Sequence, residues 1–224
     1  MSAKRVIMAW SSGKDSAWAL YRLRADPSFE LAGLLTIFSA HERVFMHAVR
    51  LEVVEAQARQ LGVPLHVLRL PPGCSHELYM ERMRSMLAEA RAGGATHVGY
   101  GDLYLESVRR HRLELLAGTG LAPVFPLWQQ DTRGLAREML QGGLETYVTA
   151  VDLKKLDRTF VGQRWDDALI ARFPPGTDPC GEEGEFHTCV VGGPMFSTRL
   201  PFELGEIVER EGYAFADLRL RDAE

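Results

Sequence analysis

The sequence predicts an α/β protein in which a parallel-sheet domain is followed by a smaller α+β domain. In the first half, short β-branched or apolar runs alternate with helical patterns, which is typical of βαβ units and a parallel sheet covered by helices. Around Pro123, Pro126 and Trp128 this alternation stops and a mixed pattern begins. We therefore predict two domains, at residues 1–126 and 127–224.

The predicted strands of the first domain are short apolar runs. They lie near residues 5–10, 31–37, 64–70, 95–101 and 122–126. Two intervening segments place apolar residues on one helical face, at the spacing that packing onto a sheet requires. These faces are Val49, Val53, Val54, Ala58 and Leu61, and Tyr79, Met83, Met86, Leu87 and Ala90. We interpret both faces as parts of the core.

The second domain is predicted to mix helices and strands. We expect a helix near 132–141, a strand near 146–151 and a helix near 163–172. A stretch rich in turn residues follows at 174–179, and the glycines and proline at 192–194 predict a closing hairpin.

The composition narrows the range of functions. With 26 Lys and Arg against 30 Asp and Glu, the formal net charge is −4, so a nucleic-acid partner is not expected. No segment approaches the roughly 18 apolar residues of a membrane span, and we expect a cytoplasmic protein without a membrane partner. Cys74, Cys180 and Cys189 form no CxxC motif, which argues against a disulfide framework or a thiolate zinc site.

A short polar loop lies between the first predicted strand and the following helical run. It reads Ser11-Ser12-Gly13-Lys14-Asp15-Ser16. Backbone N–H groups at a helix start point outward without partners and bind anions. Gly13 allows close approach of a phosphate, Lys14 can neutralise phosphate charge, and Asp15 can hold Mg²⁺, while the serine hydroxyls can donate hydrogen bonds. The alternative is an ordinary serine-rich helix cap.

Three familiar motifs do not match. A Walker A loop requires a glycine upstream of Gly13-Lys14 and Ser or Thr after it, and here Asp15 follows. No G-x-G-x-x-G is present at the first strand–helix turn. His41-Glu42 and His47 have the wrong spacing for an H-E-x-x-H zinc helix.

The polar loop resembles the S-G-G-x-D-S pyrophosphate loop (PP-loop) of the N-type ATP pyrophosphatases, with Ser12 in place of the first glycine. Four further stretches match: Arg43-Val44-Phe45-Met46-His47, Gly101-Asp102, Pro126-Leu127-Trp128 and Glu182-Glu183-Gly184-Glu185-Phe186-His187-Thr188. Together they resemble the diphthine–ammonia ligase family and its bacterial relatives over nearly the full length. The resemblance implies a Rossmann-like first domain similar to the adenine-nucleotide alpha hydrolases.

The resemblance also implies an activity. Family members are ATP-dependent amide ligases, which adenylate a carboxylate, release pyrophosphate and form the amide when ammonia displaces AMP. The implied cofactors are ATP and Mg²⁺, and the implied partners are ammonia and a carboxylate-bearing acceptor, protein-bound or small; a homodimer is left open. The nucleotide would bind beyond the strand ends, at the polar loop, Thr36 and Gly101-Asp102.

A second candidate site is the acidic segment 182–188. If this segment is extended, Glu183, Glu185 and His187 share one face, where they could bind Mg²⁺, orient ammonia or act as a general base. The alternative is a solvated acidic hairpin. We expect the three side chains to act with Lys14 and Asp15 in a cleft between the domains, facing the α-phosphate. Arg43, His47 and Arg50 could line the same cleft.

Two other functions remain open at this stage. Related pyrophosphate-loop proteins adenylate a tRNA base and deliver sulfur, but the three cysteines are poorly spaced for that chemistry. An adenine-nucleotide hydrolase or sensor, without an acceptor, is the other alternative.

Overall fold

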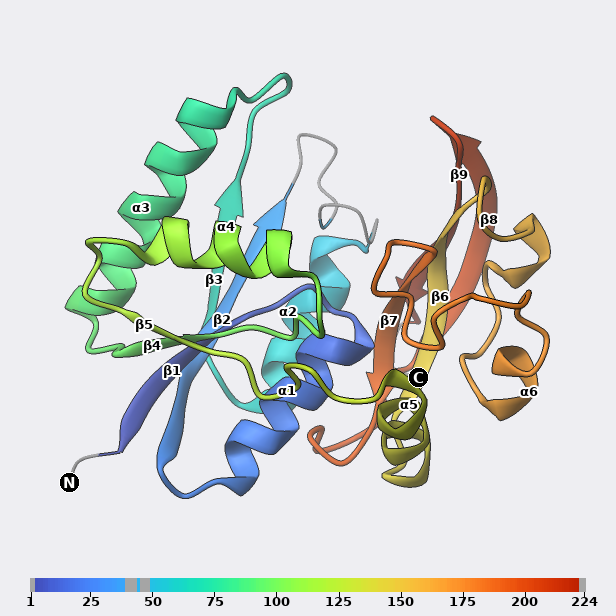
Figure 1. Ribbon diagram of the computed structural model, residues 1–224, viewed down its shortest axis with the longest axis horizontal. Coiled ribbons are helices and arrows are strands. Elements are labelled where there is room, and N and C mark those ends of the chain that lie inside the picture. Colours follow the sequence, from blue (N-terminus) through green and yellow to red (C-terminus); the bar gives the residue numbers. More distant parts are fainter. Residues whose placement is uncertain (1–2, 39–43, 45–48, 222–224) are drawn as a thin grey trace.

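Two sheets organise the chain in the computed structural model, which describes residues 3–38, 44 and 49–221 (Figure 1). The first half forms a five-stranded parallel sheet in the order β3-β2-β1-β4-β5. The second half forms a four-stranded antiparallel sheet in the order β7-β6-β9-β8. The predicted combination of a Rossmann-like α/β part and a smaller α+β part is confirmed.

The parallel sheet has short strands and is flanked by helices. Its strands are β1 (Lys4–Ala9), β2 (Phe29–Phe38), β3 (Leu65–Arg69), β4 (His97–Gly99) and β5 (Ala122–Val124). Its helices are α1 (Lys14–Ala25), α2 (Leu51–Leu61), α3 (His76–Ala92) and α4 (Glu106–Leu116). All five predicted strands are present. Helix α4 was not predicted; it carries several charged residues and an exposed Leu113.

Both faces of the parallel sheet are buried, as this architecture requires. Val6 and Met8 of β1 pack in a core with α1 and α2, whereas Ile7 points to the opposite core with α3 and α4. The predicted core faces are confirmed: Val49, Val53, Val54, Ala58 and Leu61 are buried, as are Met83, Leu87 and Ala90, with Tyr79 and Met86 partly buried.

The second half contains the remaining elements. They are α5 (Thr132–Gln141), β6 (Glu145–Asp152), the 3-10 helix η1 (Arg158–Phe160), α6 (Asp167–Ile170), β7 (Phe186–Gly192), β8 (Phe202–Arg210) and β9 (Tyr213–Leu220). The predicted helix at 132–141 is confirmed, and Asp131 caps it by accepting a hydrogen bond from Gly134 N at 2.7 Å.

The predicted helix at 163–172 is wrong. Only α6 is helical there, after Asp166 caps its first turn. The preceding residues run beside β6, where Trp165 N donates to Thr146 O at 2.9 Å and Val148 N donates to Gln163 O at 2.9 Å. These hydrogen bonds to a strand replace those of a helix.

The predicted hairpin through 192–194 is also wrong. The strands on either side of it, β7 and β8, lie on opposite edges of their sheet. The hairpin instead joins β8 to β9 through Glu211 and Gly212, whose φ angles of 52° and 82° suit a two-residue turn.

The two halves share a hydrophobic core. The core on the α1 and α2 side of the parallel sheet continues into the second sheet through Val148, Val190 and Leu218. Helix α1 contacts β7, and α2 contacts β9. These contacts bring the start of α1 against the second half. No helix in the described ranges is long and apolar enough to cross a membrane.

Candidate functional site

The polar loop 11–16 connects β1 to α1. Its helix begins at Lys14, and the cap residue Gly13 makes no side-chain cap. The serine hydroxyls bind within the loop: Ser16 Oγ donates to Gly13 O at 2.9 Å and lies 3.1 Å from Ser11 Oγ. Ser11 Oγ accepts from Gly13 N at 3.3 Å, and Thr188 Oγ1 of β7 accepts from Lys14 N at 3.1 Å. No serine of the loop therefore caps the first turn of α1 in the way that the alternative interpretation requires.

Ser12 adopts an unusual backbone conformation. Its φ is 69°, in the left-handed region that favours glycine. This is the position where the related loop motif has its first glycine. Ser12 is buried, and its carbonyl oxygen accepts a hydrogen bond from Val190 N of β7 at 2.9 Å. The loop conformation is thus held by the second half.

Lys14 is enclosed by the second half of the chain. The residue is 2% exposed, and its Nζ donates to Cys180 O and to Asp15 Oδ2, the latter at 2.8 Å. Nζ also lies 5.3 Å from the ring centre of Phe186. Burial opposes the ammonium form, but the acidic groups around Lys14, Asp15 foremost, together outweigh burial, so the pKa of Lys14 is raised and the side chain stays charged.

A cleft of about 370 Å³ opens beside the polar loop. The cleft brings together three predicted regions: the polar loop, the end of β4 and the acidic segment. Its lining includes Ser11, Lys14, Asp15, Ser16, Gly101, Asp102, Glu182, Glu183 and His187. The buried Ser12, Gly13, Thr36 and Glu185 do not line it. Residues far apart in the sequence therefore share one cleft between the two halves.

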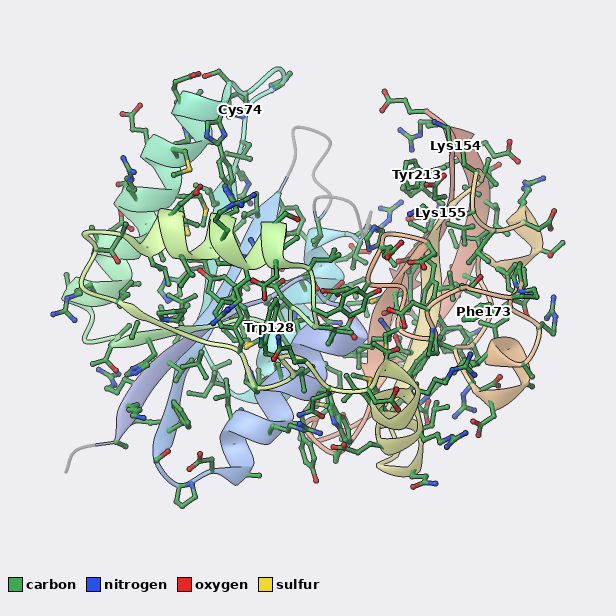
Figure 2. The ribbon with its side chains drawn as sticks, viewed as in Figure 1. Cys74, Trp128, Lys154, Lys155, Phe173 and Tyr213 are labelled. Atoms are coloured by element: carbon green, nitrogen blue, oxygen red, sulfur yellow. The ribbon has the colours of Figure 1, made fainter. Side chains whose placement is uncertain are left out.

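The acidic segment is not extended, so the predicted common face of Glu183, Glu185 and His187 is wrong. Residues 182–185 form a turn and β7 begins only at Phe186. Gly184 N donates to Gly181 O at 3.0 Å, and both glycines have positive φ angles. Lys155, labelled in Figure 2, donates from Nζ to Glu183 O at 2.6 Å and supports this turn.

The turn sends the glutamates in different directions. Glu183 is exposed at the cleft, whereas Glu185 is 6% exposed and accepts from Asp178 N at 3.2 Å. Glu182 accepts from Leu103 N at 2.8 Å and from Tyr104 N at 3.4 Å. Burial outweighs these two donors and raises the pKa of Glu182 to about 7. Glu182 can therefore exchange a proton near neutral pH.

Of the other predicted lining residues, Arg50 lies elsewhere. It forms two hydrogen bonds with the Asp217 carboxylate, both at 2.8 Å, and lines neither this cleft nor the neighbouring cavity. Arg43 and His47 lie outside the described residues.

Gly101 allows the loop and the β4 end to meet. A Cβ atom on Gly101 would lie 2.7 Å from Asp15 C and 2.7 Å from Ser16 N. A side chain there would displace the first turn of α1. The glycine is therefore required for close approach of two backbone segments.

Arg112 of α4 is a cleft residue that was not predicted from the sequence. Its Nε lies 3.1 Å from Asp102 Oδ2 and its Nη2 lies 3.4 Å from Oδ1, while the guanidinium sits 5.0 Å from the ring centre of Tyr100. Three arginines of α4 stand close together in the sequence, and nothing in their spacing singles out Arg112. Only the orientation of α4 does so.

An apolar cavity of about 490 Å³ adjoins the cleft. Its apolar lining includes Leu35, Ile37, Leu70, Met83, Leu87 and Val98. Four residues line both spaces and form what we call the shared wall: Ala9, Ser11, Tyr100 and Arg112. A ligand with an apolar, planar part and a polyanionic part could extend across this wall from cavity to cleft.

Metal binding in the cleft depends on which donor groups the protein places together. Within the described ranges no group of three or more His, Cys, Asp or Glu residues is placed to hold a metal ion. The buried Asp15 Oδ1 has no hydrogen-bond partner among the described residues. One carboxylate oxygen fits Mg²⁺ that takes its other ligands from phosphates and water.

The fold and the cleft define an α/β protein in which a polar loop after the first strand packs against the second half of the chain. Residues 4–120 match the family described as the diphthamide synthase N-terminal domain, and residues 131–219 match the diphthamide synthase C-terminal domain. The chain belongs to the diphthamide synthase family.

Several curated relatives are named diphthine–ammonia ligase. The protein of Rattus norvegicus is 25% identical over 240 residues, covering 95% of this chain and 88% of the relative. The protein of Schizosaccharomyces pombe is 29% identical over 122 residues, covering 52% of this chain and 20% of the relative. The human protein is 28% identical over 120 residues, covering 50% of this chain and 44% of the relative. The chain thus spans less than half of two of these relatives.

Proposed function

We propose that the protein is an ATP-dependent amide ligase that adenylates a substrate carboxylate and transfers the acyl group to ammonia. The observation that carries the proposal is the cleft in which the polar loop 11–16 meets the acidic segment of the second half. The names of the relatives support the same reaction class. The acceptor is a carboxylate-bearing protein or small molecule.

The nucleotide spans both spaces. Its adenine fits the apolar cavity, and its phosphates reach the polar loop across the shared wall, where Ser11, Asp15 and Ser16 line the cleft. Asp15 would hold Mg²⁺ through its free oxygen, and the ion would neutralise phosphate charge. Lys14 stabilises the loop rather than binding the nucleotide, because its Nζ donates to Cys180 O and to Asp15 Oδ2.

Adenylation solves a chemical problem, since a free carboxylate is a poor electrophile. A carboxylate oxygen of the acceptor attacks the α-phosphorus, the bond to the bridging oxygen breaks, and pyrophosphate leaves. Ammonia then attacks the acyl carbon, the nitrogen gives up one proton to solvent, the carbon–oxygen bond to AMP breaks, and the amide forms. Glu182 takes the proton that ammonium must lose before it can attack, a role suited to a carboxylate with a pKa of about 7.

The test measures which products carry the labelled phosphates of ATP. ATP labelled in the α- or the γ-phosphate is incubated with the protein, Mg²⁺, ammonium chloride and a panel of carboxylic acids and carboxylate-bearing peptides. We expect the α-label in AMP and the γ-label in pyrophosphate, with more AMP when acceptor and ammonium are both present. Label in ADP and orthophosphate would contradict the proposal. Asp15→Asn should slow AMP formation, whereas Asp26→Asn, at the exposed far end of α1, should not.

The same experiment separates the alternatives. AMP formation that ignores acceptor and ammonium would indicate an adenine-nucleotide hydrolase. A sulfur-transferring enzyme is disfavoured by the thiols, since burial raises the pKa of Cys180 and raises that of Cys189 to about 12. Cys74, labelled in Figure 2, lies on the loop before α3 at the end of the first half that is remote from β7.

A further inference from the structure

The shared wall contains one charged side chain among its four residues, Arg112. Helix α4 passes along both spaces, because Leu105 and Val108 line the cleft, His111 and Leu115 line the apolar cavity, and Arg112 lines both. A nucleotide with its base in the cavity and its terminal phosphates at the polar loop would place its α-phosphate beside this wall. Arg112 is therefore the charged residue of the shared wall beside which the α-phosphate would lie.

The other cation of the described cleft is already engaged. Lys14 is 2% exposed, and its Nζ is bound by Cys180 O and Asp15 Oδ2. An ammonium group has three donors, and two of them are used here. Breaking these contacts would leave the Asp15 carboxylate and a buried carbonyl oxygen without their partner. Lys14 is thus poorly placed to follow a reacting phosphate.

Arg112 has donors to spare. A guanidinium carries five N–H groups, and Asp102 takes one from Nε and one from Nη2. The remaining donor of Nη2 and both donors of Nη1 have no other hydrogen bond within the described part of the chain. The Asp102 carboxylate and the Tyr100 ring fix the plane of the guanidinium, which is the group best matched to the oxygens of a phosphate.

We propose that Arg112 binds the α-phosphate of ATP across the shared wall and is a catalytic residue of the adenylation step, with Asp102 as its positioning residue. The assignment rests on the proposed function. As the acceptor oxygen attacks the α-phosphorus and pyrophosphate departs, negative charge rearranges on the α-phosphate oxygens. A fixed guanidinium stabilises that charge without reorganisation.

The test compares adenosine with AMP, which differ by one phosphate, and includes ATP as the complete nucleotide. Isothermal titration calorimetry measures the affinities of adenosine, AMP and ATP for the wild type, Arg112→Gln, Arg112→Lys and the control Arg110→Gln, whose arginine is exposed on the same helix and lines neither space. In Arg112→Gln the affinity ratio of AMP to adenosine should fall about tenfold to hundredfold, the range for a charge-assisted hydrogen bond. Arg112→Lys should keep part of the ratio, and Arg110→Gln all of it.

Each other outcome has a definite meaning. An unchanged ratio in Arg112→Gln would overturn the role of Arg112 and leave the proposed function standing. An equal loss of adenosine and AMP affinity, with a lower unfolding temperature, would make Arg112 structural and also overturn the role. If Arg112→Gln does not fold, Asp102→Asn combined with Arg112→Gln removes the unpaired carboxylate, and the ratio is read there. A wild type that binds neither adenosine nor ATP would contradict the proposed function itself.

Discussion

Glu182 is a carboxylic acid held in a protein environment that favours its neutral form. Burial raises its pKa from 4.5 to about 7, although Leu103 N and Tyr104 N donate to it. Between these two values the folded chain holds a proton that the unfolded chain has released. The folded state then binds more protons, so the free energy of unfolding falls as pH rises through this window.

Glu182→Gln should remove this pH dependence, because the amide oxygen can still accept the two N–H bonds and does not titrate. From about pH 5 to about pH 8, the free energy of unfolding of the wild type should fall on the order of 2 kcal/mol through Glu182, and this fall should be absent in the variant. The difference in unfolding free energy, variant minus wild type, should therefore rise by that amount. Chemical denaturation at the two pH values measures the rise. Glu206→Gln, an exposed carboxylate on β8, is the control and should show no rise. Parallel pH profiles for wild type and Glu182→Gln would contradict the prediction.

Ser12 stores backbone strain in the polar loop, because its φ of 69° is unfavourable for any residue with a Cβ atom. Ser12→Gly and Ser12→Ala both remove the hydroxyl group, so the two variants differ mainly in the Cβ atom. We expect Ser12→Gly to be the more stable of the two by about 1 kcal/mol. Thermal unfolding of the pair decides this, and a more stable alanine variant would show that the loop relaxes to another conformation.

Gly101 sets the spacing between two elements, the end of β4 and the start of α1. A Cβ atom there would lie 2.7 Å from backbone atoms of Asp15 and Ser16, which cannot rotate away as a side chain could. Gly101→Ala should destabilise the protein by about 1–3 kcal/mol and weaken ATP binding, since the first turn of α1 must shift. Gly93→Ala is the matched control, with φ −72° and a nearest contact at 3.4 Å. Equal effects in both variants would refute the steric explanation.

At the scale of elements, the parallel sheet and its two predicted helical faces could be read from sequence, because the apolar periodicity that builds them is local. The arrangement of the second half could not. Residues 163–166 follow β6 because of hydrogen bonds to Thr146 and Val148, and β7 pairs with β6 rather than with β8. Such partners are distant in sequence, and local patterns carry no information about them.

The candidate site divides in the same way. The polar loop and Gly101-Asp102 were found because a turn between a strand and a helix leaves a local signature. The direction of Glu185 depends on the turn at 182–185, and Arg112 enters the cleft only through the orientation of α4. Neither dependence is visible in residue spacing.

At the scale of the whole molecule, the shared core predicts one cooperative unfolding transition. Gln57 is fully buried between the halves: Trp10 Nε1 donates to its Oε1 at 2.8 Å, and its Nε2 donates to Val190 O at 2.7 Å. Gln57→Leu leaves both partners unsatisfied and should destabilise the protein by about 2–4 kcal/mol while the transition stays single. Tryptophan fluorescence and far-ultraviolet circular dichroism should report coincident midpoints. Gln141→Leu, exposed on α5, is the control, and separate midpoints would contradict a shared core.

The attachment of the polar loop to the second half has a consequence for how such proteins can be recombined. Ser12 O accepts from Val190 N, Lys14 Nζ donates to Cys180 O, and Lys14 N donates to Thr188 Oγ1, so three supports of the loop come from outside the Rossmann-like part. That part is not an interchangeable module. A chimera that joins it to an unrelated partner domain inherits the loop sequence but loses all three supports, and must supply a new β-strand edge and new acceptors for Lys14 before the loop can keep its shape.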